Sequence, residues 1–400
     1  MARGMTAAPL MSERRVGLIG GLLTAIGPIS MALYTPAMPA IVEAFGTTEA
    51  MVKLTLTLYF GGFAGAQLVA GPLSDALGRR AVTYGFMGIY CAGSLAALLA
   101  PSVGLLMLAR FVQGVGASAG VAISRALVRD LFEGERSARI MNLIGIVLAA
   151  GPAVAPTIGG LVLMAAGWRA IFVVMVGFGL AVVLVTATAM RETVAPDLAR
   201  LRPRALAASY AAILADRRFR VAAGIVACAV GTLYAQATFL PFILMGRVGL
   251  GPAAFGLGML FQSGSFLLGS LATRVLMDRV GAAALVAPGL GFIAAGSLAL
   301  ALGLHLREPS FLGVMLPVAS FAVGIAFVMP ATTTAALAPF PGNAGAAAAM
   351  TGFLQMGLGL AVGSVGAALG DPVQAMGLLI PAMGAAACLL WLAGRSALSP

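Results

Sequence analysis

Long apolar stretches, separated by short polar connections, fill almost the whole chain. Each is roughly 20 residues or more in length, and a helix of about 20 residues spans the hydrocarbon of a bilayer. None shows the polar face that a surface helix of a soluble protein carries. We place twelve such spans at residues 16–38, 51–71, 80–100, 103–125, 140–164, 169–190, 219–246, 253–276, 280–303, 310–334, 343–369 and 372–394. The pattern predicts an all-α membrane protein with twelve transmembrane helices.

The composition agrees with this pattern. Hydrophobic residues make up 61% of the chain and charged residues only 9%, whereas a typical soluble domain is about 25% charged. Mean hydropathy is +1.04. These values exclude a soluble globular protein. The polar turn GPLSDALGRR at residues 71–80 fits only at a membrane surface, because lipid hydrocarbon offers no partner to the backbone groups of a loop.

Positive charges are distributed very unevenly over the connections. With a cytoplasmic N-terminus, nineteen arginines lie on the cytoplasmic side: Arg3, Arg14, Arg15, Arg79, Arg80, Arg125, Arg129, Arg136, Arg139, Arg191, Arg200, Arg202, Arg204, Arg217, Arg218, Arg220, Arg274, Arg279 and Arg395. The other side has only four positive charges, three arginines and one lysine: Lys53, Arg169, Arg247 and Arg307. This bias predicts that both termini are cytoplasmic. The net charge of +11 is therefore a topology signal, and no nucleic-acid partner is expected, because no soluble module is long enough to bind one.

The first apolar block could be the core of a cleaved signal peptide. It is longer than such a core and leads directly into the proline-containing segment at residues 36–39, so we interpret it as an uncleaved span. Cys91, Cys228 and Cys388 lie in three separate spans, and His305 is the one histidine. The sequence predicts neither a disulfide framework nor a metal site.

A long polar interruption divides the chain into two sets of six spans. We expect an N-terminal six-helix bundle at residues 1–190, a cytoplasmic linker at residues 191–218 and a C-terminal six-helix bundle at residues 219–400. Within the linker, residues 203–215 are compatible with a helix along the inner membrane surface or with a plain tether.

The second half of the chain repeats a feature of the first. The connection GSLATRVLMDRVG at residues 269–281 echoes residues 71–80, and it again places an aspartate and an arginine, Asp278 and Arg279, close to a glycine. An internal repeat of six spans is typical of transporters built from two pseudo-symmetric bundles, with the substrate site between them near the midplane.

The fourth span carries a charge within its apolar length. Arginine inside a span costs about 2.5 to 3.5 kcal/mol on insertion scales, so we expect Arg110 to face the protein interior or a wet cavity. Gln113 lies one turn further on the same face. The other polar residues expected to line a substrate cavity are Tyr34, Tyr59, Tyr234, Gln236, Gln262 and Gln355, among apolar residues such as Met31, Phe239, Phe261 and Met356. A lining with few directional donors suits amphipathic organic molecules.

Three motifs give the chain a specific resemblance to a known family. They are GPLSDALGRR at residues 71–80, RFVQG at residues 110–114 and GIVLAAGPAVAPTIGG at residues 145–160. With them the chain resembles the major facilitator superfamily, and within it the drug:proton antiporters of the Bcr/CflA type, over essentially its whole length. The segments at residues 34–39 and 168–172 resemble the same pattern. The resemblance implies two six-helix bundles and drug efflux by alternating access in exchange for protons.

The resemblance also implies roles for two sets of residues. The first motif is a conformational latch in this family, and the matching residues, with their counterparts in the second half, are Gly71, Asp75, Gly78, Arg79, Arg80, Asp278 and Arg279. The third motif marks antiporters and implies a gasket that closes one side of the cavity. Its residues here are Gly145, Gly151, Pro152, Pro156, Gly159 and Gly160. Glycine allows close helix approach and proline bends a helix.

The first span departs from the family pattern. Exporters of this type generally carry an acidic residue just before the Tyr-x-Pro segment, and the matching position here is Ala32. Every aspartate and glutamate of the chain falls at a span end or in a connection. Arginine cannot release its proton at physiological pH. The residues therefore argue against proton coupling through a carboxylate in the first span.

The leading interpretation is a secondary active transporter of the bacterial inner membrane that exports small amphipathic compounds, as gradient-driven antiport. An exporter or uniporter of an anionic metabolite is the alternative, because an unpaired Arg110 would attract a negative substrate. A membrane receptor or scaffold is the non-transport alternative. A membrane enzyme is not expected, since the spans lack clustered His, Asp, Glu or Cys. We expect no cofactor, a small-molecule substrate, protons as a candidate co-substrate, contact with the lipid bilayer and a monomeric state.

Overall fold

The computed structural model describes residues 10–398, and helices form all the regular structure in that range. Twelve helical stretches within it are long and apolar enough to cross a membrane, which confirms the predicted number. The first half contains α1 (Glu13–Tyr34), α2 (Met38–Phe45), α3 (Glu49–Leu77), α4 (Arg79–Leu98), α5 (Val103–Ala117), α6 (Ala119–Leu131), α7 (Gly134–Ala166) and α8 (Trp168–Ala189). The second contains α10 (Arg217–Pro241), α11 (Pro252–Val280), α12 (Val286–Leu306), α13 (Phe311–Leu337), α14 (Ala344–Leu369) and α15 (Pro372–Leu398).

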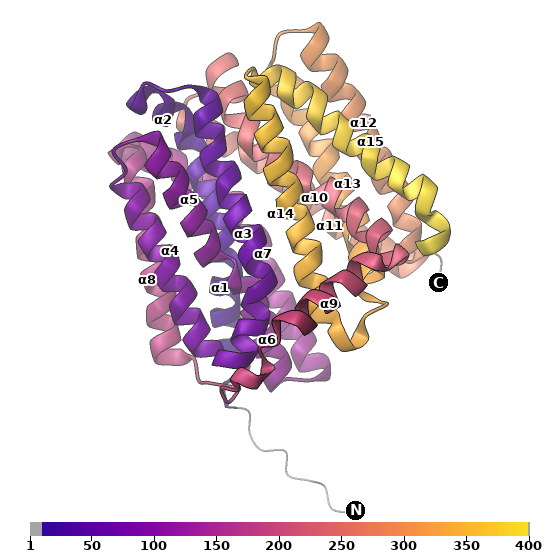
Figure 1. Ribbon diagram of the computed structural model, residues 1–400. Coiled ribbons are helices and arrows are strands. Elements are labelled where there is room, and N and C mark those ends of the chain that lie inside the picture. The colour runs from indigo at the N-terminus through magenta and orange to yellow at the C-terminus, as the bar shows by residue number, and fades with distance from the viewer. Residues whose placement is uncertain (1–9, 399–400) are drawn as a thin grey trace, which may run out of the picture.

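The two halves stand side by side as two groups of helices (Figure 1). One large cluster of buried apolar side chains comes almost entirely from residues 11–190, and another comes from residues 225–387. Helix α9 (Pro203–Ala215) crosses between the groups at one end of the molecule. We call this the linker end, and the opposite end, which holds α2 and the connection from α14 to α15, the far end. The domain bounds at residues 190 and 218 stay a prediction.

The backbone shows the internal repeat at the ends of two helices. Helix α3 ends at Gly78 with φ +95°, and α11 ends at Gly281 with φ +79°. Glycine adopts these left-handed conformations without the steric cost that a Cβ would bring. The two helices occupy corresponding places in the two halves. The predicted similarity of the two connections is therefore also a similarity of chain conformation.

Two spans at corresponding places are interrupted at the far end. In the first span, the 3-10 turn η1 (Thr35–Ala37) separates α1 from α2. In the seventh span, the π-helical turn η3 (Phe242–Arg247) follows α10. Each interruption has a proline, Pro36 or Pro241, which removes a backbone donor from the helix. Helix α2, which follows η1, packs against η3.

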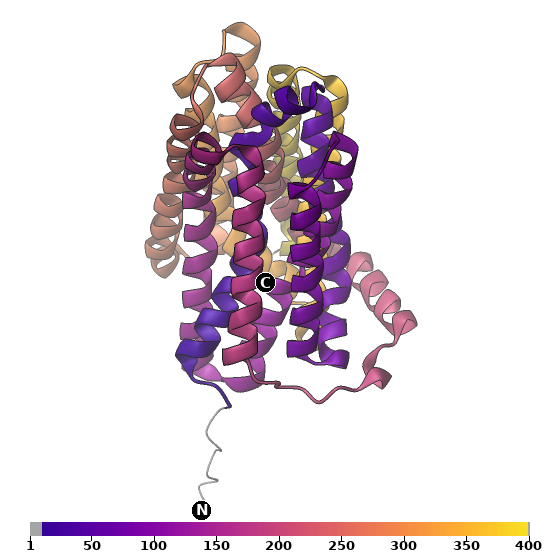
Figure 2. The ribbon, with the colours of Figure 1, turned by 90° about the vertical axis from the view of Figure 1, so that its left-hand side faces the viewer.

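The halves meet along two pairs of helices, α3 with α14 and α7 with α11. Glycine permits the closest approach between α7 and α11. A Cβ at Gly160 would lie 2.3 Å from the backbone oxygen of Pro252, and a Cβ at Gly256 would lie 2.5 Å from the Cα of Thr157. These contacts lie toward the far end, where α7 ends and α11 begins (Figure 2). The α7–α11 contact is therefore tightly closed at the far end.

A buried lysine adds a polar contact between the halves at the far end. Lys53 of α3 is 0% exposed, and its ammonium group donates to the carbonyl oxygen of Gly370 at 2.9 Å. The same group lies 3.5 Å from the Glu49 carboxylate and 5.2 Å from the centre of the Phe242 ring. Lys53 therefore joins α3 to the end of α14 and to η3.

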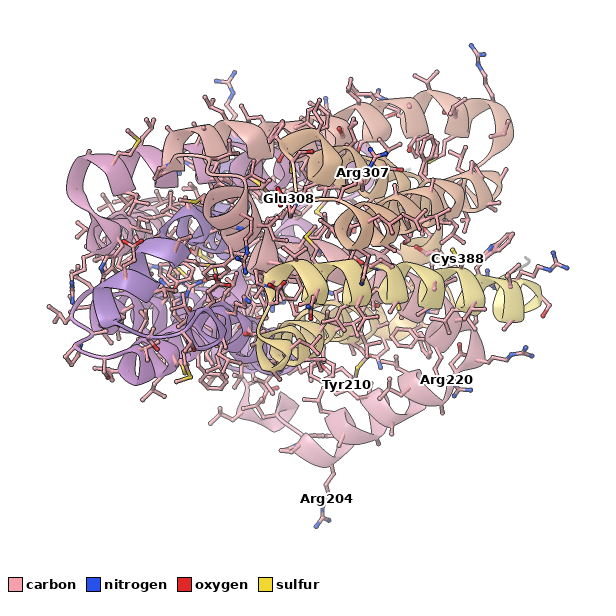
Figure 3. The ribbon with its side chains drawn as sticks, turned by 90° about the horizontal axis from the view of Figure 1, so that it is seen from above. Arg204, Tyr210, Arg220, Arg307, Glu308 and Cys388 are labelled. Atoms are coloured by element: carbon pink, nitrogen blue, oxygen red, sulfur yellow. The ribbon has the colours of Figure 1, made fainter. Side chains whose placement is uncertain are left out.

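Helix α9 packs against α10 and α14. The Tyr210 hydroxyl donates to the carbonyl oxygen of Leu68 in α3 at 2.5 Å, and burial raises the pKa of this phenol, which keeps it a donor. Arg204, at the start of the helix, points away from the body of the protein (Figure 3). Residues 203–215 thus form a helix, and its place along the inner membrane surface stays a prediction.

Several helices extend by a few residues beyond the apolar blocks from which the spans were predicted. Helix α7 begins at Gly134, whereas the apolar block that predicted it begins near residue 140. The first span ends at Phe45 rather than near residue 38. Hydropathy marks the part of a helix that needs hydrocarbon around it, while backbone hydrogen bonding continues into the interfacial region. Span existence was therefore easier to predict than span length.

Candidate transport site

Arg110 on α5 is the centre of a cluster inside the first bundle, and its side chain is 0% exposed. Its Cζ lies 4.4 Å from the ring centre of Tyr34 on α1 and 4.3 Å from that of Tyr59 on α3. Its Nη1 donates to the side-chain oxygen of Gln113 on the next turn. Each desolvated ring contact of this kind stabilises a cation by about 2 kcal/mol. Four of the predicted site residues are thus brought together, and they are enclosed rather than open to a cavity.

Gln113 extends this cluster to two further helices. Its Nε2 donates to Ser94 Oγ of α4 at 2.6 Å and lies 3.2 Å from the Met175 sulfur of α8. Nearby, the hydroxyl groups of Ser30 on α1 and Tyr90 on α4 are hydrogen-bonded at 2.6 Å. All five side chains have polar or polarizable atoms that meet inside the bundle. The result is a polar core between α1, α4, α5 and α8.

The predicted residues of the second half form a separate group. Gln262 of α11 donates to Gln236 of α10 at 2.9 Å. Tyr234 lies two residues before Gln236 on α10 and is half-buried, as is Gln355 on α14. The structure therefore brings Gln236 and Gln262 together, whereas no hydrogen bond within the described residues joins the side chain of Tyr234 or Gln355 to that pair.

Aromatic rings connect the two groups of residues. Phe60 of α3 lies with its ring centre 6.2 Å from that of Tyr59 and 5.4 Å from that of Tyr234. Since Tyr59 also covers Arg110, a continuous row of rings runs from the buried cation to the second half. The row of rings therefore connects the Arg110 cluster to α10 of the second half.

The first loop motif forms an ion-pair cluster at the linker end. Arg79, 2% exposed, has Nη1 at 2.5 Å from the Asp75 carboxylate and Nε at 3.1 Å from that of Asp130 at the end of α6. Nη1 also donates to Ser74 Oγ at 2.6 Å. The backbone N–H of Arg79 donates to Glu192, which follows α8, at 2.7 Å. The cluster therefore ties α3, α4 and α6 to the beginning of the linker.

The other residues of this motif have different surroundings. A Cβ at Gly78 would lie 2.7 Å from a Glu192 carboxylate oxygen, so this position needs glycine for space as well as for its φ. Arg80 donates to the carbonyl oxygen of Ala187 at 3.0 Å rather than to Asp75. Gly71 has nothing within 4 Å of a Cβ position. Only part of the motif takes part in the ion pairs.

The matching residues of the second half lie on the surface. Asp278 and Arg279, near the end of α11, are both exposed. Neither takes part in an ion pair recorded within the described part of the chain. The repeat therefore reproduces the glycine turn at Gly281 but not the buried cluster around Arg79.

The glycine-rich motif of α7 faces two neighbouring helices. A Cβ at Gly159 would lie 2.2 Å from the backbone oxygen of Leu33 in α1, and one at Gly151 would lie 2.9 Å from the Ile29 side chain. Gly160 faces α11, as described above. The motif thus lies where α7 meets both α1 of its own half and α11 of the other half.

The other three motif residues have different surroundings. The backbone oxygen of Pro156 would lie 2.7 Å from a Cβ at Gly256 of α11, so Pro156 also belongs to the contact between the halves. A Cβ at Gly145 would meet nothing within 4 Å. Pro152 and Pro156 lie inside α7, which continues through both positions. Because proline cannot donate a backbone hydrogen bond, it weakens the helix ladder between the glycine contacts.

The acidic residues lie outside the polar core around Arg110 and Gln113. All thirteen lie in the described range, and each is within the first or last turns of a helix or in a connection. Ala32, at the position where the family pattern has an acid, is 6% exposed on α1. Among the described residues there is no group of three His, Cys, Asp or Glu that could hold a metal ion. The three cysteines are free and lie on different helices.

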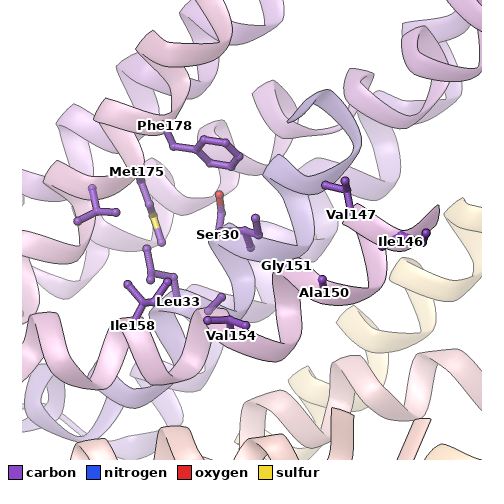
Figure 4. A pocket seen from close by; sticks show the side chains of 13 residues that line it. Ser30, Leu33, Ile146, Val147, Ala150, Gly151, Val154, Ile158, Met175 and Phe178 are labelled. Carbon is purple, nitrogen blue, oxygen red and sulfur yellow. The ribbon is translucent and has the colours of Figure 1, made fainter. Parts of the chain in front are cut away.

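A groove of about 430 Å³ lies between α1, α7 and α8 (Figure 4). Its walls are almost entirely apolar, and exposed side chains such as Ile146, Val154 and Ile158 of α7 border it. Ser30 and Met175 also line it, and both belong to the polar core described above. The groove is thus separated from the Arg110 cluster by a single layer of side chains.

Comparison with known proteins identifies the family. The family model described as the Major Facilitator Superfamily matches residues 20–364. The chain belongs to this superfamily. The solved structure of the xylose transporter XylE from E. coli, in a partially occluded inward-open conformation, matches with a TM-score of 0.72 over 95% of this chain and 97% of that chain. The sequences are 12% identical, so this likeness shows the major facilitator fold alone. The predicted all-α fold with twelve transmembrane helices is confirmed, and the cytoplasmic placement of both termini stays a prediction.

Curated members of the superfamily match over similar lengths. An uncharacterized MFS-type transporter, YdgK, of Bacillus subtilis (strain 168) is 30% identical over 349 residues, 85% of each chain. A chloramphenicol resistance protein of Pseudomonas aeruginosa is 32% identical over 349 residues, 85% of this chain and 80% of that protein. The multidrug resistance protein MdtL of Salmonella paratyphi A is 29% identical over 354 residues, 86% of this chain and 85% of that protein. The family resemblance drawn from the motifs is confirmed.

Sequence reasoning missed some participants. Asp130 and Glu192 were assigned only to span ends, yet both bind Arg79 or its backbone. Their positions next to the ends of the fourth and sixth spans were the available signal. Lys53 was counted among the charges on the side opposite the cytoplasm and is in fact buried. Glu49, four residues earlier on the same helix face, was the signal for a partner.

Proposed function

We propose that this protein exports small amphipathic organic compounds from bacteria by secondary active transport. The observation that carries the proposal is the match over most of the chain to superfamily members named for chloramphenicol and multidrug resistance. The protein is a multi-pass transporter of the bacterial inner membrane and not an enzyme. Aromatic and methionine side chains around few polar groups suit substrates with a large apolar part.

Alternating access needs contacts that hold one end closed and can be released. We assign this role at the far end to the glycine-mediated contact between α7 and α11 and to Lys53. At the linker end we assign it to the latch built from Asp75 and Arg79, with Asp130 and Glu192 as its additional members. A substrate shifts the balance between states only by binding them unequally.

The proposed substrate contacts are the residues predicted from the sequence: Tyr34, Tyr59, Arg110, Gln113, Tyr234, Gln236, Gln262 and Gln355. Two observations support this set. Tyr34, Tyr59 and Gln113 surround the buried cation of Arg110. The row of rings through Phe60 links them to Tyr234, so a change at the interface between the halves reaches the whole group.

We propose that transport is driven by an ion gradient and that any proton carried binds near a span end. No carboxylate lies in the middle of a span, and Arg110 holds its proton at physiological pH. Asp75 is our choice of carrier, because its partner Arg79 ties it to three helices. We further propose that a single chain is the working unit, since both six-helix halves are present in it.

A second candidate function is export or uniport of an anionic metabolite without proton coupling. The observation that favours it is the guanidinium of Arg110, which is buried without a carboxylate partner among the described residues. An anion would supply the missing charge. Membrane potential would then drive export, at about 2.3 kcal/mol per charge per 100 mV.

Transport in everted vesicles tests both candidates. A panel of neutral, cationic and anionic compounds is presented with the pH gradient imposed and collapsed. The first proposal predicts uptake of neutral amphipathic compounds above vesicles that lack the protein. The second predicts uptake of anions that follows membrane potential. No uptake of any compound above the control would contradict both.

A further inference from the structure

The guanidinium of Arg110 has one edge that the protein does not use. Nη1 donates to the side-chain oxygen of Gln113, and the rings of Tyr34 and Tyr59 pack against the guanidinium group. The remaining nitrogens, Nε and Nη2, are both buried and have no hydrogen-bond partner. These two nitrogens form the side-on edge of arginine, whose parallel N–H groups match the two oxygens of a carboxylate.

The neighbouring polar groups are already occupied. The Tyr34 hydroxyl is bonded to Thr55 at 2.6 Å, and the Tyr59 hydroxyl donates to the carbonyl oxygen of Gly27 at 2.9 Å. Their oxygens are therefore directed at other groups rather than at the free edge. Since buried polar groups in proteins are normally paired, the free edge of Arg110 requires an explanation.

A counter-ion from within the bundle would be the usual explanation. The aspartates and glutamates of the chain all lie near helix ends or in connections, and the first-span position that could have held an acid is Ala32. A charge that is buried without a partner is costly, and the ring contacts offset only part of that cost. The pairing charge must therefore come from a ligand.

We propose that the Nε–Nη2 edge of Arg110 binds a two-oxygen anion, of the carboxylate class. This deepens the proposed function, on which it rests, by naming the group on the transported compound or its companion that this site recognises. The source is either a carboxylate of the substrate itself or a free small carboxylate that binds together with a neutral substrate. The edge is enclosed in this conformation, so the side chains around it must move before the anion binds.

Thermal unfolding of the purified protein in neutral detergent tests the site without transport. The probes are sodium benzoate, its uncharged counterpart benzamide and sodium chloride at the same concentration. A ligand that binds only the folded protein raises Tm. We expect benzoate to raise the Tm by about 2 °C or more and benzamide and chloride to leave it unchanged. An equal rise with benzamide or with chloride would overturn the assignment to a two-oxygen anion.

Two arginine variants make this test specific. Arg110→Gln should lose the response to benzoate, whereas Arg204→Gln, which removes an arginine pointing away from the body (Figure 3), should keep it. If Arg110→Gln does not fold, Arg110→Lys keeps the charge but lacks the side-on edge, and its response should fall at least severalfold. A full benzoate response in the folded Arg110 variant would refute the proposal.

Flux measurements in proteoliposomes separate the two sources. If the substrate carries the carboxylate, labelled benzoate itself is transported by the wild-type protein and not by the Arg110 variant. If the anion is a companion, flux of neutral chloramphenicol rises when acetate is added. A benzoate-induced rise in Tm without any flux would contradict the proposed transport function and leave the anion site standing. Flux of chloramphenicol without any benzoate-induced rise in Tm would contradict the anion site and leave the proposed transport function standing.

Discussion

Arg79 shows how one residue joins several elements of the linker end. It is almost fully buried and has two carboxylate partners of different exposure: Asp75 is 45% exposed and Asp130 14%. Water screens the more exposed partner, so its contribution to folding stability is small, whereas a hydrogen bond from a charged donor to a better shielded carboxylate contributes about 1.5 to 3 kcal/mol. The motif predicted Asp75 as the partner, but we expect Asp130 to be the stronger one, because its side chain is the less exposed of the two. That ranking depends on how α6 packs, which no local pattern contains.

We therefore expect Asp130→Asn to lower the stability of the protein more than Asp75→Asn. The expected losses are about 1.5 to 3 kcal/mol for Asp130→Asn and under about 1 kcal/mol for Asp75→Asn. Thermal unfolding of both variants in the same detergent measures the difference. Asp75→Asn should instead slow transport, because it weakens a latch contact. A larger stability loss in Asp75→Asn would show that exposure does not rank the two partners.

In helix α7, too, part of the structure was predictable from the motif and part depends on packing between helices. Its motif is recognisable in the sequence, and the spacing of the glycines places them at helix contacts. Which neighbour each glycine faces could not be predicted, because that depends on how the halves are placed. Gly159 faces α1, Gly160 faces α11, and Gly145 faces open space.

Gly160→Ala should loosen the closed far end, and Gly145→Ala is its matched control on the same helix. The added methyl group at residue 160 would lie 2.3 Å from the Pro252 oxygen, so α7 and α11 must separate, whereas residue 145 has room. A cysteine introduced at Thr157, which packs on Gly256, reports the separation through its labelling by a membrane-impermeant maleimide. The native cysteines are replaced first. Equal labelling rates in the two alanine variants would contradict the gasket role.

The whole molecule was predictable in outline. Twelve spans, the repeat and the family followed from hydropathy and short motifs, because the membrane forces each span to be long, apolar and helical. The candidate site was predictable only as a list. Tyr34, Tyr59, Arg110 and Gln113 meet in one cluster, but their enclosure and the free edge of Arg110 result from the packing of three helices, which the sequence pattern does not contain.

Proton coupling is a property of the whole transport cycle. Since no acidic residue lies in the middle of a span, we expect substrate binding to release no proton from the membrane interior. Proton release on adding substrate to purified protein in weak buffer measures this directly. Stoichiometric release that disappears in Asp75→Asn would identify Asp75 as the carrier. Stoichiometric release that persists in Asp75→Asn would contradict the assignment of coupling to this latch.

The most direct test of the proposed transport function is the flux of chloramphenicol through purified protein in proteoliposomes. The compound is loaded on one side, no pH gradient is applied, and the wild-type protein is compared with Arg110→Gln and with protein-free liposomes. We expect downhill flux in the wild type well above both controls, because the Arg110 cluster in the first bundle takes part in every transport cycle. Wild-type flux no greater than that of protein-free liposomes, for chloramphenicol and for other amphipathic compounds, would contradict it.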